Sequence, residues 1–205
     1  GGVYVGGTLT SKSGNVFTHN RASSNGGDIY VDTSSIIVTL TSNSMSRGQA
    51  TDGASIYLAS GGLSIDQSSF DNSQANNNGG IYLADGTFHL TNSNYSFGNA
   101  TGYGGAIYTK TLQTVQIQNN IFSNNLAVLG GGIYIEQGAF TVDTIQFLQN
   151  QANNGGAVYT QTGTIGVSTS KFIGNKASGQ GAGYYQAAGS WASVLTVYQQ
   201  NQATA

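Results

Sequence analysis

The side chains best suited to chemistry in this chain are its eight carboxylates, since two of them held close together serve polysaccharide-cleaving enzymes as acid and base. They are Asp28, Asp32, Asp52, Asp66, Asp71, Asp85, Glu136 and Asp143. Counted from the repeated tyrosine described below, Asp32 and Glu136 share one position but lie four repeats apart. Asp66 and Asp143 share another position and lie three repeats apart. At one β-strand spacing per repeat these intervals are about 19 Å and 14 Å, whereas a glycosidase pair needs about 5 to 10 Å, so we expect no catalytic residues and no enzyme.

Other residue types that bind metals or cofactors are equally sparse. Asp28 and Asp52 fall in adjacent repeats but are offset by three positions, which suits neither a calcium site nor an acid/base pair. His19 and His89 are single residues in different repeats, and the chain has no cysteine. No lysine follows the glycine doublets in the arrangement of a phosphate-binding loop. The sequence therefore predicts no metal site and no cofactor, and Trp191 is expected to be a packing residue, with a sugar-stacking platform as the alternative.

The composition of the chain limits the kinds of partner that it can bind. With six basic residues and a net charge of −2, the chain has no electrostatic footprint for nucleic acid, and it has no apolar run long enough to insert into a membrane. Two Asn-x-Ser/Thr sequons begin at Asn94 and Asn99, which marks them as possible N-glycosylation sites.

These residues are positioned by a repeat that runs through the whole chain. Glycines and a β-branched residue precede a tyrosine that recurs every 25 to 27 residues. The tyrosines are Tyr4, Tyr30, Tyr57, Tyr82, Tyr108, Tyr134, Tyr159 and Tyr185. Because side chains alternate along a strand, the β-branched residues should point inward and the tyrosines outward, as a ladder of stacked rings. The glycine doublets are expected to turn the chain into each strand.

A second anchor follows in step. An aromatic residue or Met recurs, and alanine comes five positions after it in all eight repeats. Asparagine stands two positions before that alanine in five repeats: Asn20, Asn125, Asn150, Asn175 and Asn201. We expect the aromatic residues and alanines to fill the interior, and these asparagines to form an internal ladder that holds the register.

Between the anchors, apolar residues alternate with period two, which indicates strands. A leucine-rich repeat needs a leucine framework, and a propeller blade takes roughly 40 to 45 residues. A parallel β-helix fits instead, because each coil stacks on the last and places like residues on like. The prediction is one all-β domain over 1–205, a solenoid of about eight coils of roughly 26 residues.

Two motifs of this repeat resemble a known class. They are GGAI, at Gly104-Gly105-Ala106-Ile107, and FxxN, which begins at Phe17, Phe122, Phe147 and Phe172. Together they resemble the repeats of polymorphic outer-membrane proteins among the autotransporter adhesins. The resemblance implies a right-handed, pectin-lyase-like β-helix outside the cell or on its surface, with an adhesion or scaffold role and with carbohydrate or other surface proteins as possible partners.

The ends of the sequence lie in mid-repeat, and neither carries an evident cap. We expect further coils to continue the register, either through head-to-tail stacking of identical subunits into a fibril or within a longer chain. The sequence thus favours an extracellular structural rod without catalysis. The alternative is a β-helix that binds or cleaves polysaccharide.

Overall fold

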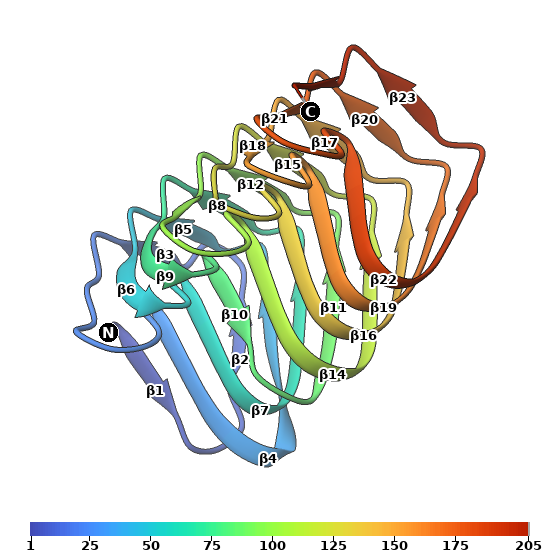
Figure 1. The fold of residues 1–205 in the computed structure, drawn as a ribbon. Helices are drawn as coiled ribbons and strands as arrows, with labels where there is room; N and C mark the ends of the chain where they lie inside the picture. Colours follow the sequence, from blue (N-terminus) through green and yellow to red (C-terminus); the bar gives the residue numbers. More distant parts are fainter. Residues whose placement is uncertain (205) are drawn as a thin grey trace.

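The computed structural model is a parallel β-solenoid of about eight turns, and it describes residues 1–204, apart from the side chains of residues 33–36 and 112–113. Successive coils stack side by side along one axis, and the two chain ends lie at opposite ends of the stack (Figure 1). Every pairing between strands is parallel. None of the described residues forms a helix capable of spanning a membrane. The predicted all-β solenoid is confirmed.

The broadest wall of the solenoid, called sheet A here, is built from long strands that follow each tyrosine anchor. Most of these strands bend and run for 11 to 13 residues, because the pattern of inward apolar side chains continues past the bend. Its strands are β1 (Val3–Val5), β2 (Thr10–Lys12), β4 (Ile29–Thr41), β7 (Ile56–Asp66), β10 (Ile81–Leu83), β11 (Thr87–Thr91), β14 (Ile107–Gln118), β16 (Ile133–Asp143), β19 (Val158–Ser168) and β22 (Tyr184–Val194).

Two further walls complete each coil. Sheet B carries the aromatic anchors and consists of β3 (Val16–Thr18), β5 (Ser44–Ser46), β8 (Ser69–Asp71), β12 (Asn94–Ser96), β15 (Ile121–Ser123), β17 (Gln146–Leu148), β20 (Lys171–Ile173) and β23 (Val197–Gln199). Sheet C carries the alanines in two separate groups of three strands: β6 (Gln49–Asp52), β9 (Gln74–Asn78) and β13 (Asn99–Ala100), then β18 (Gln151–Ala152), β21 (Lys176–Ala177) and β24 (Gln202–Ala203).

The register is the one that the repeat predicts. Tyr4 pairs with Tyr30, and Tyr134 pairs with both Tyr108 and Tyr159. Phe147 likewise pairs with its counterparts in the neighbouring coils of sheet B. In-register stacking places every repeat position in a column that runs along the axis, so a column is the natural unit for describing both core and surface.

The core is a set of such columns. The β-branched residues before the tyrosines are buried from Ile29 to Val158, and the aromatic anchors are buried from Met45 to Phe172. The alanine column is buried from Ala50 to Ala177. Only the first and last coils depart from this pattern, since each has a neighbouring coil on one side alone. The predicted interior is therefore confirmed for the six central coils.

The turns are made by glycines and by other residues with positive φ, and the sequence predicted only the glycine turns. A glycine with positive φ makes the turn from sheet C back to sheet A, as at Gly26 (67°) and Gly155 (63°). The other two turns of each coil use residues that are mostly not glycine. One, between sheets A and B, includes Asn92 (48°) and Leu195 (50°); the other, between sheets B and C, includes Asn124 (56°) and Phe97 (54°). Asparagine tolerates this left-handed conformation better than most residues.

Candidate binding surface

The asparagine ladder is continuous through the last four coils. Oδ1 of Asn150 accepts from Nδ2 of Asn125 at 2.9 Å, and Nδ2 of Asn150 donates to Oδ1 of Asn175 at 3.1 Å. Asn175 continues to Asn201 at 2.9 Å. Each Nδ2 also donates to a backbone carbonyl of the preceding coil, as from Asn150 to Phe122 at 2.9 Å. These buried amides therefore bind each coil to its neighbours on both sides.

Asn20 does not belong to this ladder, which corrects the prediction for that residue. Its Nδ2 donates to Oδ1 of Asp28 at 2.9 Å. In the three coils between Asn20 and Asn125 the column holds Gly48, Ser73 and Gly98 instead. The inward amide therefore disappears for three coils, and other polar groups take its place.

Polar side chains from other columns of these coils replace the missing asparagine amides. Opposite Gly48 stands the buried carboxylate of Asp28, and a Cβ at Gly48 would lie 2.8 Å from Oδ2 of Asp28. The hydroxyls of Ser73, one coil further, and of Tyr95, two coils further, are hydrogen-bonded in the core. A Cβ at Gly80 would lie 1.5 Å from the Tyr95 hydroxyl, so that glycine makes room for the tyrosine. The column of aromatic anchors thus supplies a polar atom where the asparagine column has none.

Asp28 is the one fully buried carboxylate among the described residues. Burial raises the pKa of Asp28 from 3.8 to about 6, while the hydrogen bond from Asn20 acts in the opposite direction. Among the described residues no hydrogen-bond partner reaches Oδ2 of Asp28 or Oγ of Ser55, which stands in the same column one coil on. Burial likewise raises the pKa of Tyr95, and the charge of Asp28 adds to the rise.

A second internal ladder runs beside the first and was not anticipated from the sequence. The backbone N–H of Asn43 donates to Oγ of Ser68, that of Ser68 to Oγ of Ser93, and that of Ser93 to Oδ1 of Asn120, at 2.7 to 3.1 Å. These residues stand two positions before each aromatic anchor. Asn, Ser or Thr fills that position in every coil except the one with Ile145, so the spacing could have revealed it.

The tyrosine ladder is present along the whole solenoid. Consecutive rings are stacked with centroids 4.7 to 5.7 Å apart and interplanar angles up to 24°. The ring faces therefore contact one another, and the ring edges and hydroxyls face away from the core.

Part of this ladder is covered. Tyr108, Tyr134 and Tyr159 are buried, and Tyr103 and Leu129 pack over them. Sequence alternation correctly indicated that these rings leave the core, but the neighbouring turns hide them from solvent. Tyr185 in the last coil is partly exposed, and the ladder is most open at the first coil, where Tyr4 is 68% exposed.

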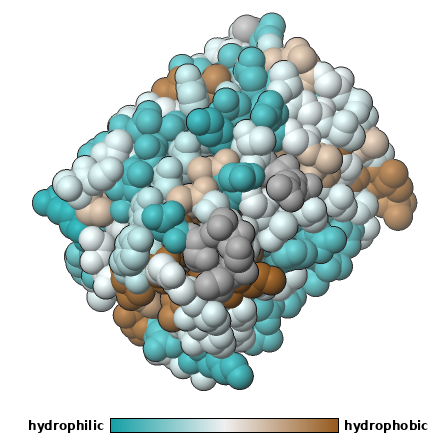
Figure 2. Space-filling model, turned by 90° about the horizontal axis from the view of Figure 1, so that it is seen from below, coloured by the Kyte–Doolittle hydropathy of each residue, from teal (hydrophilic) through white to brown (hydrophobic). Residues whose placement is uncertain are grey.

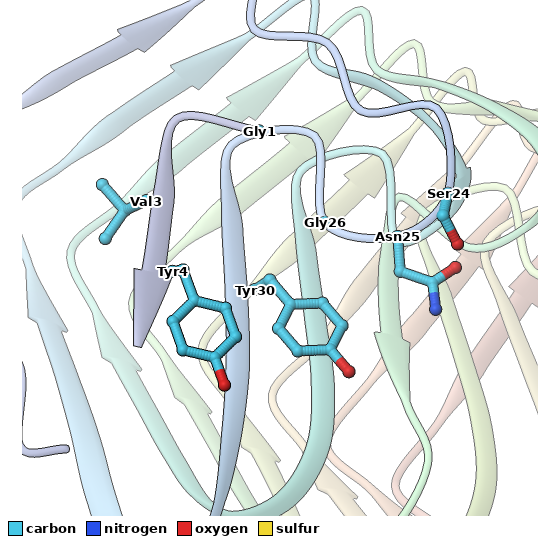
Figure 3. Close-up of a pocket in the computed structure, with 7 residues that line it drawn as sticks. All are labelled: Gly1, Val3, Tyr4, Ser24, Asn25, Gly26 and Tyr30. Atoms are coloured by element: carbon cyan, nitrogen blue, oxygen red, sulfur yellow. The ribbon is translucent and has the colours of Figure 1, made fainter. Parts of the chain in front are cut away.

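At that open end lies a hollow of about 370 Å³ between the ladder and a turn. Figure 3 shows Tyr4 and Tyr30 side by side, with their hydroxyls pointing the same way, next to the turn that carries Ser24 and Asn25. The Tyr4 hydroxyl donates to Oδ2 of Asp32 at 3.4 Å.

Two tyrosines of the ladder, Tyr4 and Tyr108, each donate a hydrogen bond to one carboxylate of the adjacent coil. The Tyr108 hydroxyl donates to Glu136. Burial raises the pKa of Tyr82 and of Tyr134 to about 12, so these phenols stay neutral near neutral pH. These hydroxyls keep their protons near neutral pH and can act as hydrogen-bond donors.

Most of the remaining carboxylates accept a hydrogen bond from an adjacent coil, whereas Asp85 accepts one from the backbone N–H of Gly86. Oδ1 of Asp66 accepts from the Thr91 hydroxyl at 2.7 Å, and Oδ1 of Asp143 accepts from Ser168 at 2.6 Å, which lowers the pKa of Asp143. Among the described residues, no three of the His, Cys, Asp and Glu side chains are grouped so that they could hold a metal ion. Asp66 and Asp143 therefore each help to hold two adjacent coils together, and each does so singly.

The other residues singled out from the sequence are dispersed. His19 is exposed beside Arg47. Trp191 packs against Tyr184 with ring centroids 3.6 Å apart and meets Phe172 edge-on, as the packing interpretation expected. Asn94 and Asn99 are both exposed, and their glycosylation stays a prediction.

Comparison with known proteins gives one finding. Residues 121–136 and 144–161 match the Chlamydia polymorphic membrane protein repeat. Each stretch contains an FxxN segment followed by the glycine turn and the β-branched residue before a tyrosine. No curated protein and no solved structure matches the chain. The chain is therefore a β-solenoid of about eight turns, in which these two stretches match the polymorphic membrane protein repeat.

Proposed function

We propose that this chain is a non-catalytic solenoid displayed on a cell surface, where its outer columns serve adhesion or scaffolding. The observation that carries the proposal is the match of two coils to a surface protein's repeat within a solenoid built throughout from the same columns. The inner columns are occupied by stacking contacts, and any recognition therefore belongs to the outward columns.

The hydrogen-bonding of the carboxylates supports the non-catalytic part. Asp66 and Asp143 each accept from a hydroxyl of the next coil, and Glu136 accepts from Tyr108. A glycosidase needs two such groups about 5 to 10 Å apart around one bond. Incubating the purified chain with a panel of polysaccharides should release no reducing ends, and sustained release abolished by Asp66→Asn or Asp143→Asn would contradict the proposal.

Surface display is tested on the source cells. An antibody against the solenoid should label intact cells, and brief treatment of those cells with protease should remove the label. Labelling that appears only after permeabilisation would overturn the proposal. An antibody against a cytoplasmic protein serves as the control for cell integrity.

A finer proposal concerns the strand edges of the first and last coils, which we expect to stack end to end on those of a second copy of this chain. Figure 2 shows hydrophobic residues at the right edge and at the lower left of the view, whereas the far left edge is hydrophilic. Val16 is exposed in the first coil, and Val194 and Leu195 are exposed in the last. Light scattering of the purified chain over a concentration series should detect end-to-end oligomers that appear as rods in electron micrographs. A monomer at all concentrations would exclude stacking of separate copies.

A further inference from the structure

One outer face of the solenoid consists of three columns of mostly amide and hydroxyl side chains, and we call it the amide face. Its columns are the turn between sheets B and C, the residue before each alanine and the residue after it. They comprise His19, Arg47, Asn72, Phe97, Asn124, Gln149, Gly174 and Gln200; Arg21, Gln49, Gln74, Asn99, Leu126, Gln151, Lys176 and Gln202; and Ser23, Thr51, Asn76, Thr101, Val128, Asn153, Ser178 and Thr204.

The amide face is hollowed near both ends. One groove of about 390 Å³ is lined by Arg21, Gln49, Gln74 and Asn76 among others. In its wall the Arg21 guanidinium donates to Oε1 of Gln49 at 2.9 Å, and Gln49 donates to Gln74 at 3.4 Å. These side chains are therefore held in order before any ligand arrives.

The other groove, of about 580 Å³, runs between two columns, with Gln149, Gly174 and Gln200 on one wall and Gln151, Lys176 and Gln202 on the other. A Cβ at Gly174 would meet only Cγ of Gln149, at 3.6 Å. The missing side chain at Gly174, whose φ of 64° itself favours glycine, thus leaves this wall open.

Between the grooves lies a small apolar patch made of Phe97, Leu126 and Val128, which are 53%, 43% and 40% exposed. Each is the one apolar side chain in its column, and all three fall in two adjacent coils. Phe97 also has a φ of 54°, where Asn72 and Asn124 have 53° and 56°. A bulky residue in this conformation is strained, and here it still leaves about half of its surface exposed, which points to a role outside folding.

Charge on the amide face differs from charge on the chain as a whole. Three of the six basic residues, Arg21, Arg47 and Lys176, stand in these columns, and none of the eight acidic residues does. The carboxylates next to the face are occupied. Asp71 accepts from Asn72 and Ser96, and Asp52 accepts from the next coil. The amide face therefore favours a sparsely anionic ligand.

We propose that the amide face binds an extended polysaccharide that carries carboxylate groups and lies along the solenoid axis. Amide columns repeat at about the 4.8 Å strand spacing. An extended β-linked glycan advances by nearly the same interval per sugar, so successive sugars meet successive coils. Phe97 offers an apolar surface for a sugar ring, the amides pair with hydroxyls, and the basic residues pair with carboxylates. Nucleic acid is disfavoured, because three basic residues over eight coils are too few for its phosphates.

This inference rests on the proposed surface role and names the partner's chemistry. The probe is a hyaluronan oligosaccharide, which carries one carboxylate per disaccharide, and a neutral cello-oligosaccharide of equal length is the comparison. Calorimetry should detect binding of hyaluronan and at least tenfold weaker binding of the neutral chain. Equal affinity for both, or no binding of hyaluronan, would overturn the proposal.

Phe97→Asn tests the aromatic contact, because Asn is the residue of the neighbouring coils in the same conformation. It should weaken hyaluronan binding about tenfold, as loss of a central contact does, without lowering Tm. The matched control is Leu195→Asn. Leu195 is also apolar, 82% exposed and left-handed (φ 50°), but it lies at the other turn. Equal weakening by both variants would refute the assignment of the site to the amide face.

Lys176→Gln tests the charge, since glutamine fills this position in the adjacent coils. Binding should weaken up to about fivefold at low salt, and the difference should shrink as salt is added. Lys171→Gln removes a charge from sheet B of the same coil and should change affinity less than twofold; an equal effect would contradict the proposal. Gly174→Asn, which fills the groove, should weaken binding at least as much as Lys176→Gln.

Failure of this inference is distinguishable from failure of the surface role. Intact-cell labelling without hyaluronan binding overturns the assignment of the amide face and leaves the surface role standing. Hyaluronan binding that behaves as expected in the variants, combined with labelling only after permeabilisation, upholds the binding site and overturns the surface role.

Discussion

Truncating Asn150 to alanine is the sharpest test of the internal ladder. The side chain is fully buried and makes four hydrogen bonds: Oδ1 accepts from N and Nδ2 of Asn125, and Nδ2 donates to Phe122 O and to Oδ1 of Asn175. In the variant, the buried backbone N–H of Asn125 and one N–H of the Asn125 side-chain amide lose their acceptor. Each such group costs about 1–3 kcal/mol, so with the small cavity we expect a loss of about 3–5 kcal/mol.

That loss is a large fraction of the roughly 5–15 kcal/mol by which domains are stable. Urea unfolding followed by circular dichroism measures it, and hydrogen exchange at the Asn125 amide reports whether the opening is local, as solenoids with nearest-neighbour coupling allow. Gln151→Ala, the next residue but exposed, should cost less than about 0.5 kcal/mol. Asn201→Ala, whose side chain is half-buried in the last coil, should fall between the two.

The reasoning is refuted if Asn150→Ala costs no more than about 1 kcal/mol beyond Gln151→Ala. It is also refuted if Asn201→Ala costs as much as Asn150→Ala, because the ladder's contribution would then not depend on desolvation.

Three further predictions address other columns. Tyr95→Phe should cost about 1–2 kcal/mol in urea unfolding, because the Ser73 hydroxyl loses its partner, and adding Ser73→Ala should recover part of the loss. Gly155→Ala should destabilise far more than Gly174→Ala: both have φ near 63°, but a Cβ at Gly155 would lie 2.5 Å from Val158 O. Burial raises the pKa of Asp28 from 3.8 to about 6, so the folded state retains a proton that the unfolded chain releases. Stability should therefore fall by up to about 3 kcal/mol as pH rises from 4 to 7, and Asp28→Asn should remove this slope.

Much of the fold could be predicted from the sequence, because parallel in-register stacking translates each column directly into a fixed interval along the chain. The tyrosine interval of 25 to 27 residues therefore determined the pairing of Tyr4 with Tyr30 and of every later pair. Non-glycine turns were missed for a physical reason: residues such as Gln149 and Thr144 carry a Cβ that disfavours positive φ, so their type does not mark a left-handed turn.

The candidate surface was less predictable. A search for columns finds Asn125, Asn150 and Asn175, but it does not find Asp28 opposite Gly48, because this compensation occurs across one coil and not along the stack. Alternation indicated that the tyrosines leave the core, yet the cover over Tyr134 comes from Tyr103 in a variable turn. Contacts that bridge different columns are therefore where sequence reasoning fell short.

Departures from the repeat differ in whether the fold compensates for them. Inside the solenoid, a lost amide at Gly48 is matched by the carboxylate of Asp28, and the gaps at Gly80 and Gly98 accommodate the hydroxyl and ring of Tyr95. Such compensation indicates selection for stacking. Phe97 has no compensating partner of this kind: it accepts a left-handed backbone and stays 53% exposed where asparagine would suffice. Since folding alone favours asparagine there, the uncompensated departures on the amide face are the positions at which recognition, and not stability, best accounts for the residue.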